Sequence, residues 1–159
     1  MKVNLSPAEY YKTLAKKPMG SGVLILNQKE ELLLVYDLFH KRWQLPGGSC
    51  NHNESPLQAA IREAQEEVGL TPKLLQLACV EWCSSSSFKA DHLQFVFYTG
   101  IWDENTLRQI KLQEDEIGEC RFFPLEEALK TAHQRTSRRI AACVPFKNKT
   151  VYMEDGRIL

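Results

Sequence analysis

Three carboxylates at helical spacing stand out in the segment between residues 47 and 70. Glu63, Glu66 and Glu67 occupy positions i, i+3 and i+4, so one face of a helix would carry all three side by side. Like charges at this spacing repel each other, and a divalent cation bound through carboxylate oxygens removes that repulsion. Mg²⁺ characteristically combines one or two carboxylates with phosphate oxygens of a substrate. The alternative is that this charged run is the solvated face of an amphipathic helix.

Local signals place that helix at about 56–68. Ser55, Pro56 and Gln58 have the form of a capping box with proline in the first turn. Gly69 stands where a left-handed cap would end the helix. The glutamates therefore lie in the second half of a well-bounded helix.

A helical wheel divides the same helix into two faces. Four aliphatic residues share a narrow arc and are predicted to bury against a sheet, namely Leu57, Ile61, Ala64 and Val68. Ala59 and Ala60 are expected on the side of the glutamates, where small side chains leave room for a ligand. Arg62 lies on the flank, within reach of a carboxylate.

The remaining chain supplies the elements that must position this helix. Apolar and β-branched runs predict strands at 21–27, 31–38, 43–45, 74–82, 92–102 and 119–125, with a strand or hairpin at 150–158. Pro46-Gly47-Gly48 is predicted to terminate the third strand. Helices are predicted at about 6–16, 125–133 and 136–143. Strands before and after the central helix favour a mixed sheet with helices on its faces.

Composition indicates one globular domain over residues 1–159, because 43% of the residues are hydrophobic and 25% are charged. The 20 basic and 20 acidic residues cancel, which argues against a whole surface built to hold polyanions. The zero net charge is the sum of segments of opposite charge, because the helix is acidic and the segment 135–159 is basic. Five cysteines without a Cys-x-x-Cys pair predict reduced thiols, and no long apolar run or secretory signal is present, so a cytoplasmic location is expected.

The flanks of the helix carry a more specific pattern. Its fixed positions are Gly48, Glu54, Arg62-Glu63, Glu66-Glu67 and Gly69-Leu70, and the strand before it ends in WQLPGG. In this spacing the chain resembles the Nudix hydrolase family, with an intact Nudix box at 48–70 and a resemblance over roughly residues 20–130. Ala64 departs from the usual larger aliphatic residue. The resemblance implies an α/β (α+β) fold, a Nudix-like α/β/α sandwich with a mixed β-sheet and a central catalytic helix.

The resemblance also implies an activity. Nudix hydrolases use Mg²⁺ or Mn²⁺ to cleave the pyrophosphate bond of a nucleoside diphosphate linked to another moiety. The implied metal-binding and catalytic residues are Glu63, Glu66 and Glu67, with the carbonyl of Gly47 or Gly48, Gly47 being the first choice, as a further metal ligand. Glu54 and Arg62 are implied to position those carboxylates.

The general base stays open between two positions. Glu63 is the first choice, and the acidic run Glu114, Asp115 and Glu116 lies where many Nudix proteins place an additional carboxylate. Each residue of that run is equally well explained as a solvated loop charge.

The sequence leaves the substrate open as well. A small-molecule nucleotide diphosphate derivative is expected, with no membrane partner, and a homodimer is compatible with the family. General nucleic-acid binding is disfavoured, while capped RNA stays open. The alternatives are a catalytically silent nucleotide-sensing module, which usually loses box carboxylates, and an isoprenoid-diphosphate isomerase, which would require a dedicated catalytic cysteine.

Three further groups have both a functional and a structural interpretation. Trp43, Trp82, Phe88, Tyr98 and Trp102 either stack on a base or belong to the core. The turn His40-Lys41-Arg42 either contacts phosphate or is solvated. The basic residues Arg135, Arg138, Arg139, Lys147 and Lys149 either support binding of polyphosphate or RNA or form a solvated surface.

Overall fold

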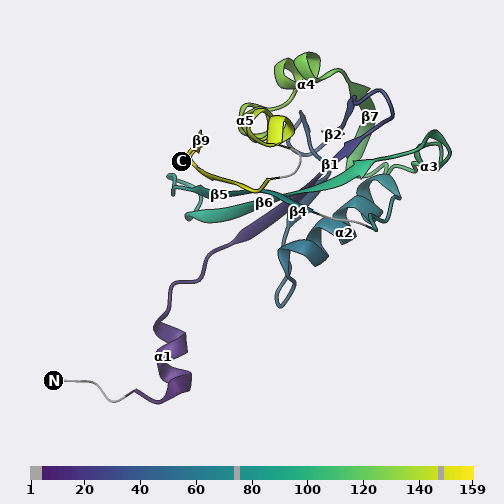
Figure 1. The fold of residues 1–159 in the computed structure, drawn as a ribbon. Helices are drawn as coiled ribbons and strands as arrows, with labels where there is room; N and C mark the ends of the chain where they lie inside the picture. The colour runs from purple at the N-terminus through teal and green to yellow at the C-terminus, as the bar shows by residue number, and fades with distance from the viewer. Residues whose placement is uncertain (1–4, 74–75, 147–148) are drawn as a thin grey trace.

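The apolar runs of the sequence form the strands of one mixed sheet. The computed structural model describes residues 5–73, 76–146 and 149–159 (Figure 1). The strands are β1 (Met19–Leu26), β2 (Leu32–Asp37), β3 (Arg42–Gln44), β4 (Gly47–Ser49), β5 (Gln76–Cys83), β6 (His92–Ile101), β7 (Ile117–Phe123), β8 (Val151–Glu154) and β9 (Arg157–Ile158). The helices are α1 (Pro7–Thr13), α2 (Pro56–Val68), α3 (Glu104–Leu107), α4 (Leu125–Thr131) and α5 (Gln134–Cys143), followed by the 3₁₀ turn η1 (Val144–Phe146).

The strand order is β3-β2-β1-β6-β5-β8-β9, with β4 paired to β1 and β7 paired to β2. The pairs β1–β6 and β5–β8 are parallel, and the other pairs are antiparallel. Such mixed pairing confirms the expected sheet. The predicted strand boundaries agree to within about three residues, although residues 74–75 of the predicted fifth run lie outside the described residues.

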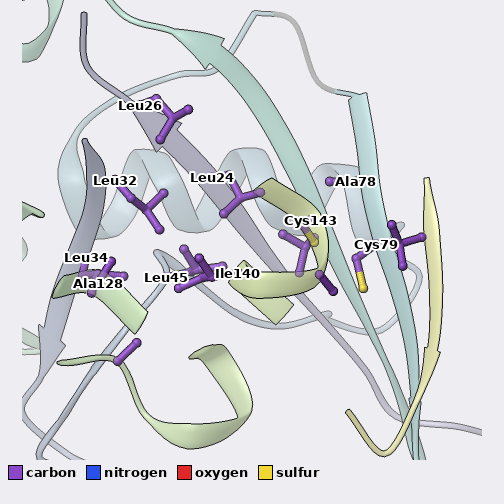
Figure 2. Close-up of a cluster of buried hydrophobic side chains, with 14 of the residues drawn as sticks. Leu24, Leu26, Leu32, Leu34, Leu45, Ala78, Cys79, Ala128, Ile140 and Cys143 are labelled. Atoms are coloured by element: carbon purple, nitrogen blue, oxygen red, sulfur yellow. The ribbon is translucent and has the colours of Figure 1, made fainter. Parts of the chain in front are cut away.

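Alternation along β1 divides the interior into two layers. Val23 and Ile25 face α2, whereas Leu24 and Leu26 face the helices α4 and α5. Figure 1 shows α2 on one face of the sheet and α4 and α5 on the other, and Figure 2 shows the second cluster around Leu24, Ile140 and Cys143. The predicted α/β/α sandwich is confirmed.

The third strand ends before Pro46-Gly47-Gly48, as predicted, but the sequence did not predict the short strand that follows. Residues 47–49 form β4, which pairs with β1 through Gly22 and Gly47. Gly47 has φ +149°, and a Cβ added there would overlap the carbonyl oxygen of Ser21. Only glycine permits this close approach, which brings the loop before α2 against the sheet.

The predicted buried face of α2 was wrong in part. Leu57 is 42% exposed, whereas Ala59, Ala60, Ala64 and Val68 are fully buried. The alanines have no long side chain to hold the helix away from β1, so they, rather than Leu57, face the sheet. The burial of Ala59 and Ala60 removes them as space for a ligand.

The N-terminal helix is shorter than the predicted 6–16. It covers Pro7–Thr13, begins with a capping box between Ser6 and Glu9, and buries none of its residues. Figure 1 shows α1 lying away from the sheet. Among the helices of the described ranges, none has the length and apolar character needed to cross a membrane.

Candidate active site

The carboxylates singled out by the sequence lie in the second half of α2, which packs beside the strand β4. Ser55 caps the helix through the backbone N–H of Gln58, and Gly69 ends it in the left-handed conformation with φ +71°. Both signals agree with the predicted helix of about 56–68. The helix therefore presents Glu63, Glu66 and Glu67 next to β4 and the loop that follows it.

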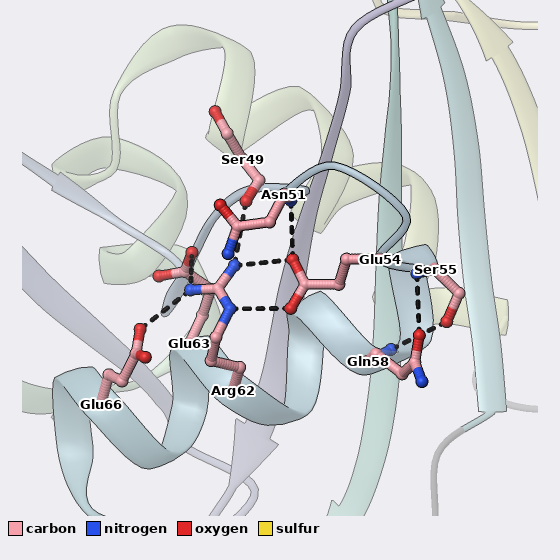
Figure 3. A network of polar contacts seen from close by, with 8 residues as sticks. All are labelled: Ser49, Asn51, Glu54, Ser55, Gln58, Arg62, Glu63 and Glu66. Atoms are coloured by element: carbon pink, nitrogen blue, oxygen red, sulfur yellow. Dashed lines mark hydrogen bonds and ion pairs between the residues drawn. The ribbon is translucent and has the colours of Figure 1, made fainter.

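Arg62 is the centre of the polar network on this helix (Figure 3). Its guanidinium donates to Glu54 through Nε–Oε1 at 2.7 Å and Nη2–Oε2 at 2.9 Å. Nη1 donates to Glu63 Oε1 at 2.7 Å and to Glu66 Oε2 at 2.8 Å, and Nη2 also donates to the carbonyl of Ser49 at 3.0 Å. One cation thus holds three carboxylates and the end of β4 in fixed positions.

Glu54 is fixed from two directions. Besides Arg62, the backbone N–H of Asn51 donates to its Oε2 at 2.7 Å. The hydrogen bonds from Arg62 and then from Asn51 lower the pKa of Glu54 to about 2. Glu54 is therefore ionised throughout the neutral range, and it ties the loop before α2 to Arg62.

Glu67 lies in a different environment. It is only 5% exposed, and its Oε2 accepts a hydrogen bond of 2.7 Å from the backbone N–H of Gly47. Burial, followed by repulsion from Glu63, Asp37 and Glu116, raises the pKa of Glu67 to about 8 against the lowering effect of the Gly47 hydrogen bond. Glu67 forms no ion pair among the described residues, unlike Glu54, Glu63 and Glu66.

Glu63 lies against β4. A Cβ placed on Gly48 would come within 2.6 Å of the Glu63 carboxyl carbon, so glycine leaves the space that this carboxylate occupies. Burial raises the pKa of Glu63, although the Arg62 hydrogen bond opposes the shift. Glu63 and Glu67 are thus two partly desolvated carboxylates whose charges repel each other.

Both carboxylates face a cleft of about 680 Å³. Acidic side chains from three parts of the chain line it, namely Asp37, Glu63, Glu67, Asp115 and Glu116. The structure thus brings Asp115 and Glu116 to the cleft, whereas Glu114 lines a separate hollow beside Ile110 and Gly118. Glu66 lies outside the cleft lining, with its side chain 48% exposed and bound to Arg62.

Some of the other candidates from the sequence line the cleft, and others do not. His40 and Arg42 line the cleft, and His40 Nδ1 lies 2.6 Å from Asp37 Oδ2. None of the five candidate aromatic residues is among the described residues that line the cleft. Trp43 instead packs edge-on against Tyr36.

Phe39 is the aromatic residue that the sequence analysis missed. It lines the cleft and is 85% exposed. It follows the end of β2 in a turn, and no spacing or periodicity in the sequence distinguishes it from other exposed aromatic residues.

The donor set fits a hard divalent cation. In the described part of the chain no group of three or more His, Cys, Asp or Glu side chains is already arranged around a metal position. Burial, followed by neighbouring negative charge, raises the pKa of Glu67, and burial also raises the pKa of the half-buried Glu63 beside it. A divalent cation would neutralise both, and carboxylate oxygens are the ligands that Mg²⁺ and Mn²⁺ accept.

Two known hydrolases are similar to this chain in sequence. An RNA pyrophosphohydrolase from Hydrogenovibrio crunogenus is 43% identical over 51 residues, which make up 32% of this chain and 31% of that protein. Nudix hydrolase 6 from Arabidopsis thaliana is 30% identical over 124 residues, 71% of this chain and 41% of that protein. The matches therefore span less than half the length of these two relatives.

A solved structure gives the same answer for the fold. The MutT protein from Methanosarcina mazei Go1 superposes with a TM-score of 0.68 at 25% identity, covering 86% of this chain and 100% of that one. A sequence profile of the NUDIX domain matches residues 16–143. Since that range includes the strands β1 to β7, α2 and both helices of the opposite face, the chain belongs to the NUDIX domain family.

Proposed function

We propose that this chain is a metal-dependent nucleotide pyrophosphohydrolase, which cleaves the pyrophosphate bond of a nucleoside diphosphate linked to another moiety. The observation that carries the proposal is the pair Glu63 and Glu67, two partly desolvated carboxylates that face a cleft of about 680 Å³. The names of the relatives, an RNA pyrophosphohydrolase and a Nudix hydrolase, support the same reaction class.

The carboxylates of Glu63, Glu66 and Glu67 and the carbonyl of Gly47 would hold Mg²⁺ or Mn²⁺. When bound, the cation neutralises phosphate charge and lowers the pKa of a coordinated water. Arg62 keeps Glu63 and Glu66 oriented, and Glu54 keeps Arg62 in place. Glu67 is held by the backbone N–H of Gly47, which fixes its distance from β4.

Proton transfer from the attacking water requires a general base in the cleft. Glu63 is the first candidate because its carboxylate lines the cleft, where it could accept a proton from water. Asp115 and Glu116 also line the cleft and are the second candidates, whereas Glu114 lies outside it.

Two alternatives make different demands on the cleft. An isoprenoid-diphosphate isomerase would need a cysteine there, and the described residues that line the cleft include none. A silent sensing module would not need Glu63 and Glu67 together in a desolvated site. We therefore favour hydrolysis, and a homodimer and a cytoplasmic location stay predictions.

The test is direct incubation of the purified protein with nucleoside triphosphates, dinucleoside polyphosphates, nucleotide sugars, ADP-ribose and capped RNA. Each reaction contains Mg²⁺, Mn²⁺ or excess EDTA, and products are separated by ion-exchange chromatography. We expect metal-dependent cleavage of at least one substrate at its pyrophosphate bond. Tight binding of one compound without cleavage of any would overturn the proposal in favour of the sensing module.

A further inference from the structure

Basic side chains line a second part of the same cleft. They come from β3, from the segment before β6, from β6 itself and from the beginning and middle of α5. We call them the basic side of the cleft, and its members are Arg42, Lys89, His92, His133, Arg135 and Arg139. The proposed hydrolytic reaction assigns no role to any of them.

Arg139 is built into this basic side. Its Nε donates to the carboxylate of Glu81, with the two side chains 12% and 5% exposed, and its Nη2 lies 3.5 Å from the sulfur of Cys83. A buried pair of this kind holds the guanidinium in one position. Arg135 precedes it by one helical turn on α5, so both arginines lie on the same face of that helix.

Arg135 and Lys89 carry charge that no close carboxylate offsets. Neither forms an ion pair within the described ranges. Hydrogen bonds from Ser84 lower the pKa of Asp155, and the charge of Arg135 contributes to that shift. The Asp155 carboxylate, however, accepts its hydrogen bonds from Ser84 and not from Arg135. The positive charge of both side chains is thus available to an anion in the cleft.

Arg42, Lys89, Arg135 and Arg139 all line this part of the cleft, so their positive charges repel one another. Burial lowers the pKa of Lys89, and Arg135, Arg139 and Arg42 lower it further. Burial also lowers the pKa of His133, and the same three arginines add to that shift. A multivalent anion would relieve this repulsion, as a divalent cation would relieve that between Glu63 and Glu67.

We propose that the basic side binds a phosphate group other than the phosphate attacked by water, so that the substrate is a linear chain of three or more phosphates. Glu63 and Glu67 line one part of the cleft and would hold, with a cation, the phosphate attacked by water, whereas the basic side offers positive charge to a further phosphate in the same cleft. A longer chain supplies a further anion, and guanidinium groups are well matched to phosphate oxygens. This inference rests on the proposed function and narrows its substrate class to polyphosphates, either free nucleotides or the 5′ end of an RNA.

The first test measures binding without turnover. Isothermal titration in EDTA compares inorganic phosphate, pyrophosphate and tripolyphosphate for the unaltered protein, Arg135→Gln, Lys89→Gln and the matched control Arg138→Gln. Arg138 is on the same helix but lies beside Gly156, where an added Cβ would come within 2.6 Å of its Cδ. All three substitutions remove one positive charge, but only two remove it from the cleft.

We expect tripolyphosphate to bind at least about tenfold more tightly than phosphate, and to lose about tenfold in affinity in Arg135→Gln and in Lys89→Gln. The Arg138→Gln protein should keep its affinity within about twofold, because its change affects only the long-range field, which salt screens. Equal binding of phosphate and tripolyphosphate, or an equal loss in all three variants, would overturn the inference.

A second measurement separates this inference from the proposed function. The same variants are assayed with Mg²⁺ on a nucleoside triphosphate, a 5′-triphosphorylated RNA oligonucleotide and ADP-ribose. We expect Arg135→Gln and Lys89→Gln to lose kcat/KM on both triphosphates and to change little on ADP-ribose. The triphosphate that the unaltered protein cleaves with the higher kcat/KM shows whether the substrate is a free nucleotide or the 5′ end of an RNA. Equal losses on all three substrates would contradict the inference while leaving hydrolysis intact. Charge-dependent tripolyphosphate binding without any turnover would contradict the proposed function and leave the phosphate site intact.

Discussion

Arg62 and Glu54 face each other across the start of α2 in a two-point contact, with Nε–Oε1 at 2.7 Å and Nη2–Oε2 at 2.9 Å. The contact joins residues eight positions apart and leaves Nη1 free to bind Glu63 and Glu66. Glu54 thereby determines the orientation of a cation that in turn orients two of the proposed metal ligands.

Glu54→Gln should weaken metal binding or turnover without removing any proposed metal ligand. The amide cannot accept two charge-assisted hydrogen bonds, so Arg62 loses its fixed orientation. We expect a loss of about 10- to 100-fold in kcat/KM or in Mn²⁺ affinity. Glu104→Gln, which removes an exposed carboxylate paired with Arg108, is the matched control. Equal activity of both variants would show that Glu54 does not position the site.

Gly48→Ala should damage activity more than stability. The new methyl group would overlap the end of the Glu63 side chain, which can move away at little cost to the fold. We expect a loss of about tenfold or more in kcat/KM because the carboxylate is displaced. In a Glu63→Gln protein, Gly48→Ala should cause a much smaller further loss in kcat/KM, because the carboxylate that it displaces is already absent. Additive losses would argue against a shared cause.

Glu67 should make the metal-free protein less stable as the pH rises. Its pKa is raised from 4.5 to about 8 by burial. The folded state therefore keeps a proton that the unfolded state releases, so the stabilisation is complete below about pH 4.5 and is lost as the pH rises to about 8.

The measurement is urea unfolding in EDTA at pH 5 and pH 8 for the unaltered protein, Glu67→Gln and Glu104→Gln. The unaltered protein should lose free energy of unfolding between pH 5 and pH 8, whereas Glu67→Gln should not lose this contribution. The difference in unfolding free energy between the two proteins should therefore shift in favour of Glu67→Gln by up to a few kcal/mol. An unchanged difference between these two proteins would mean that Glu67 is not desolvated. Mg²⁺ should stabilise the unaltered protein more at pH 8 than at pH 5, because protons compete for the same oxygens.

The orientation of α2 predicts opposite effects at its two faces. Ala60→Leu introduces extra volume at a fully buried position and should cost about 1–3 kcal/mol of unfolding free energy. Leu57→Ser changes a side chain that is 42% exposed and should alter stability by no more than about 0.5 kcal/mol. Thermal or urea unfolding checks both predictions. A larger loss of unfolding free energy in Leu57→Ser than in Ala60→Leu would mean that Leu57 lies on the buried face of α2, as expected from the sequence.

The sequence predicted the elements better than their contacts. The capping box at Ser55 and the glycine at 69 determine α2 locally, so its limits followed from nearby residues. The buried face of α2 followed only in part. Ala64 and Val68 are buried as predicted, but hydrophobicity favours Leu57 whereas close packing in the core favours Ala60. The strand β4 was missed because two glycines resemble a turn until a partner strand is known.

The same distinction applies to the site. The spacing of Glu63, Glu66 and Glu67 indicated carboxylates on one helix, and Arg62 forms hydrogen bonds with Glu54 and Glu63 in the structure. The structure adds that Glu67, not Glu66, is the buried member of the adjacent pair. The sequence offered Arg42, Arg135 and Arg139 as separate candidates for phosphate contact. It could not show that they line one cleft with Lys89, because they come together only when distant strands and α5 meet.

The most direct test of the account is the rate of pyrophosphate bond cleavage as a function of Mg²⁺ concentration, measured for the unaltered protein, Glu67→Gln and Glu104→Gln. The account predicts no cleavage in EDTA, a saturable rise with Mg²⁺ in the unaltered protein and in Glu104→Gln, and a loss of at least about 100-fold in Glu67→Gln, whose amide cannot replace the anionic ligand. Cleavage that persists in EDTA, or a Glu67→Gln protein with the same Mg²⁺ dependence and rate as the unaltered one, would contradict it.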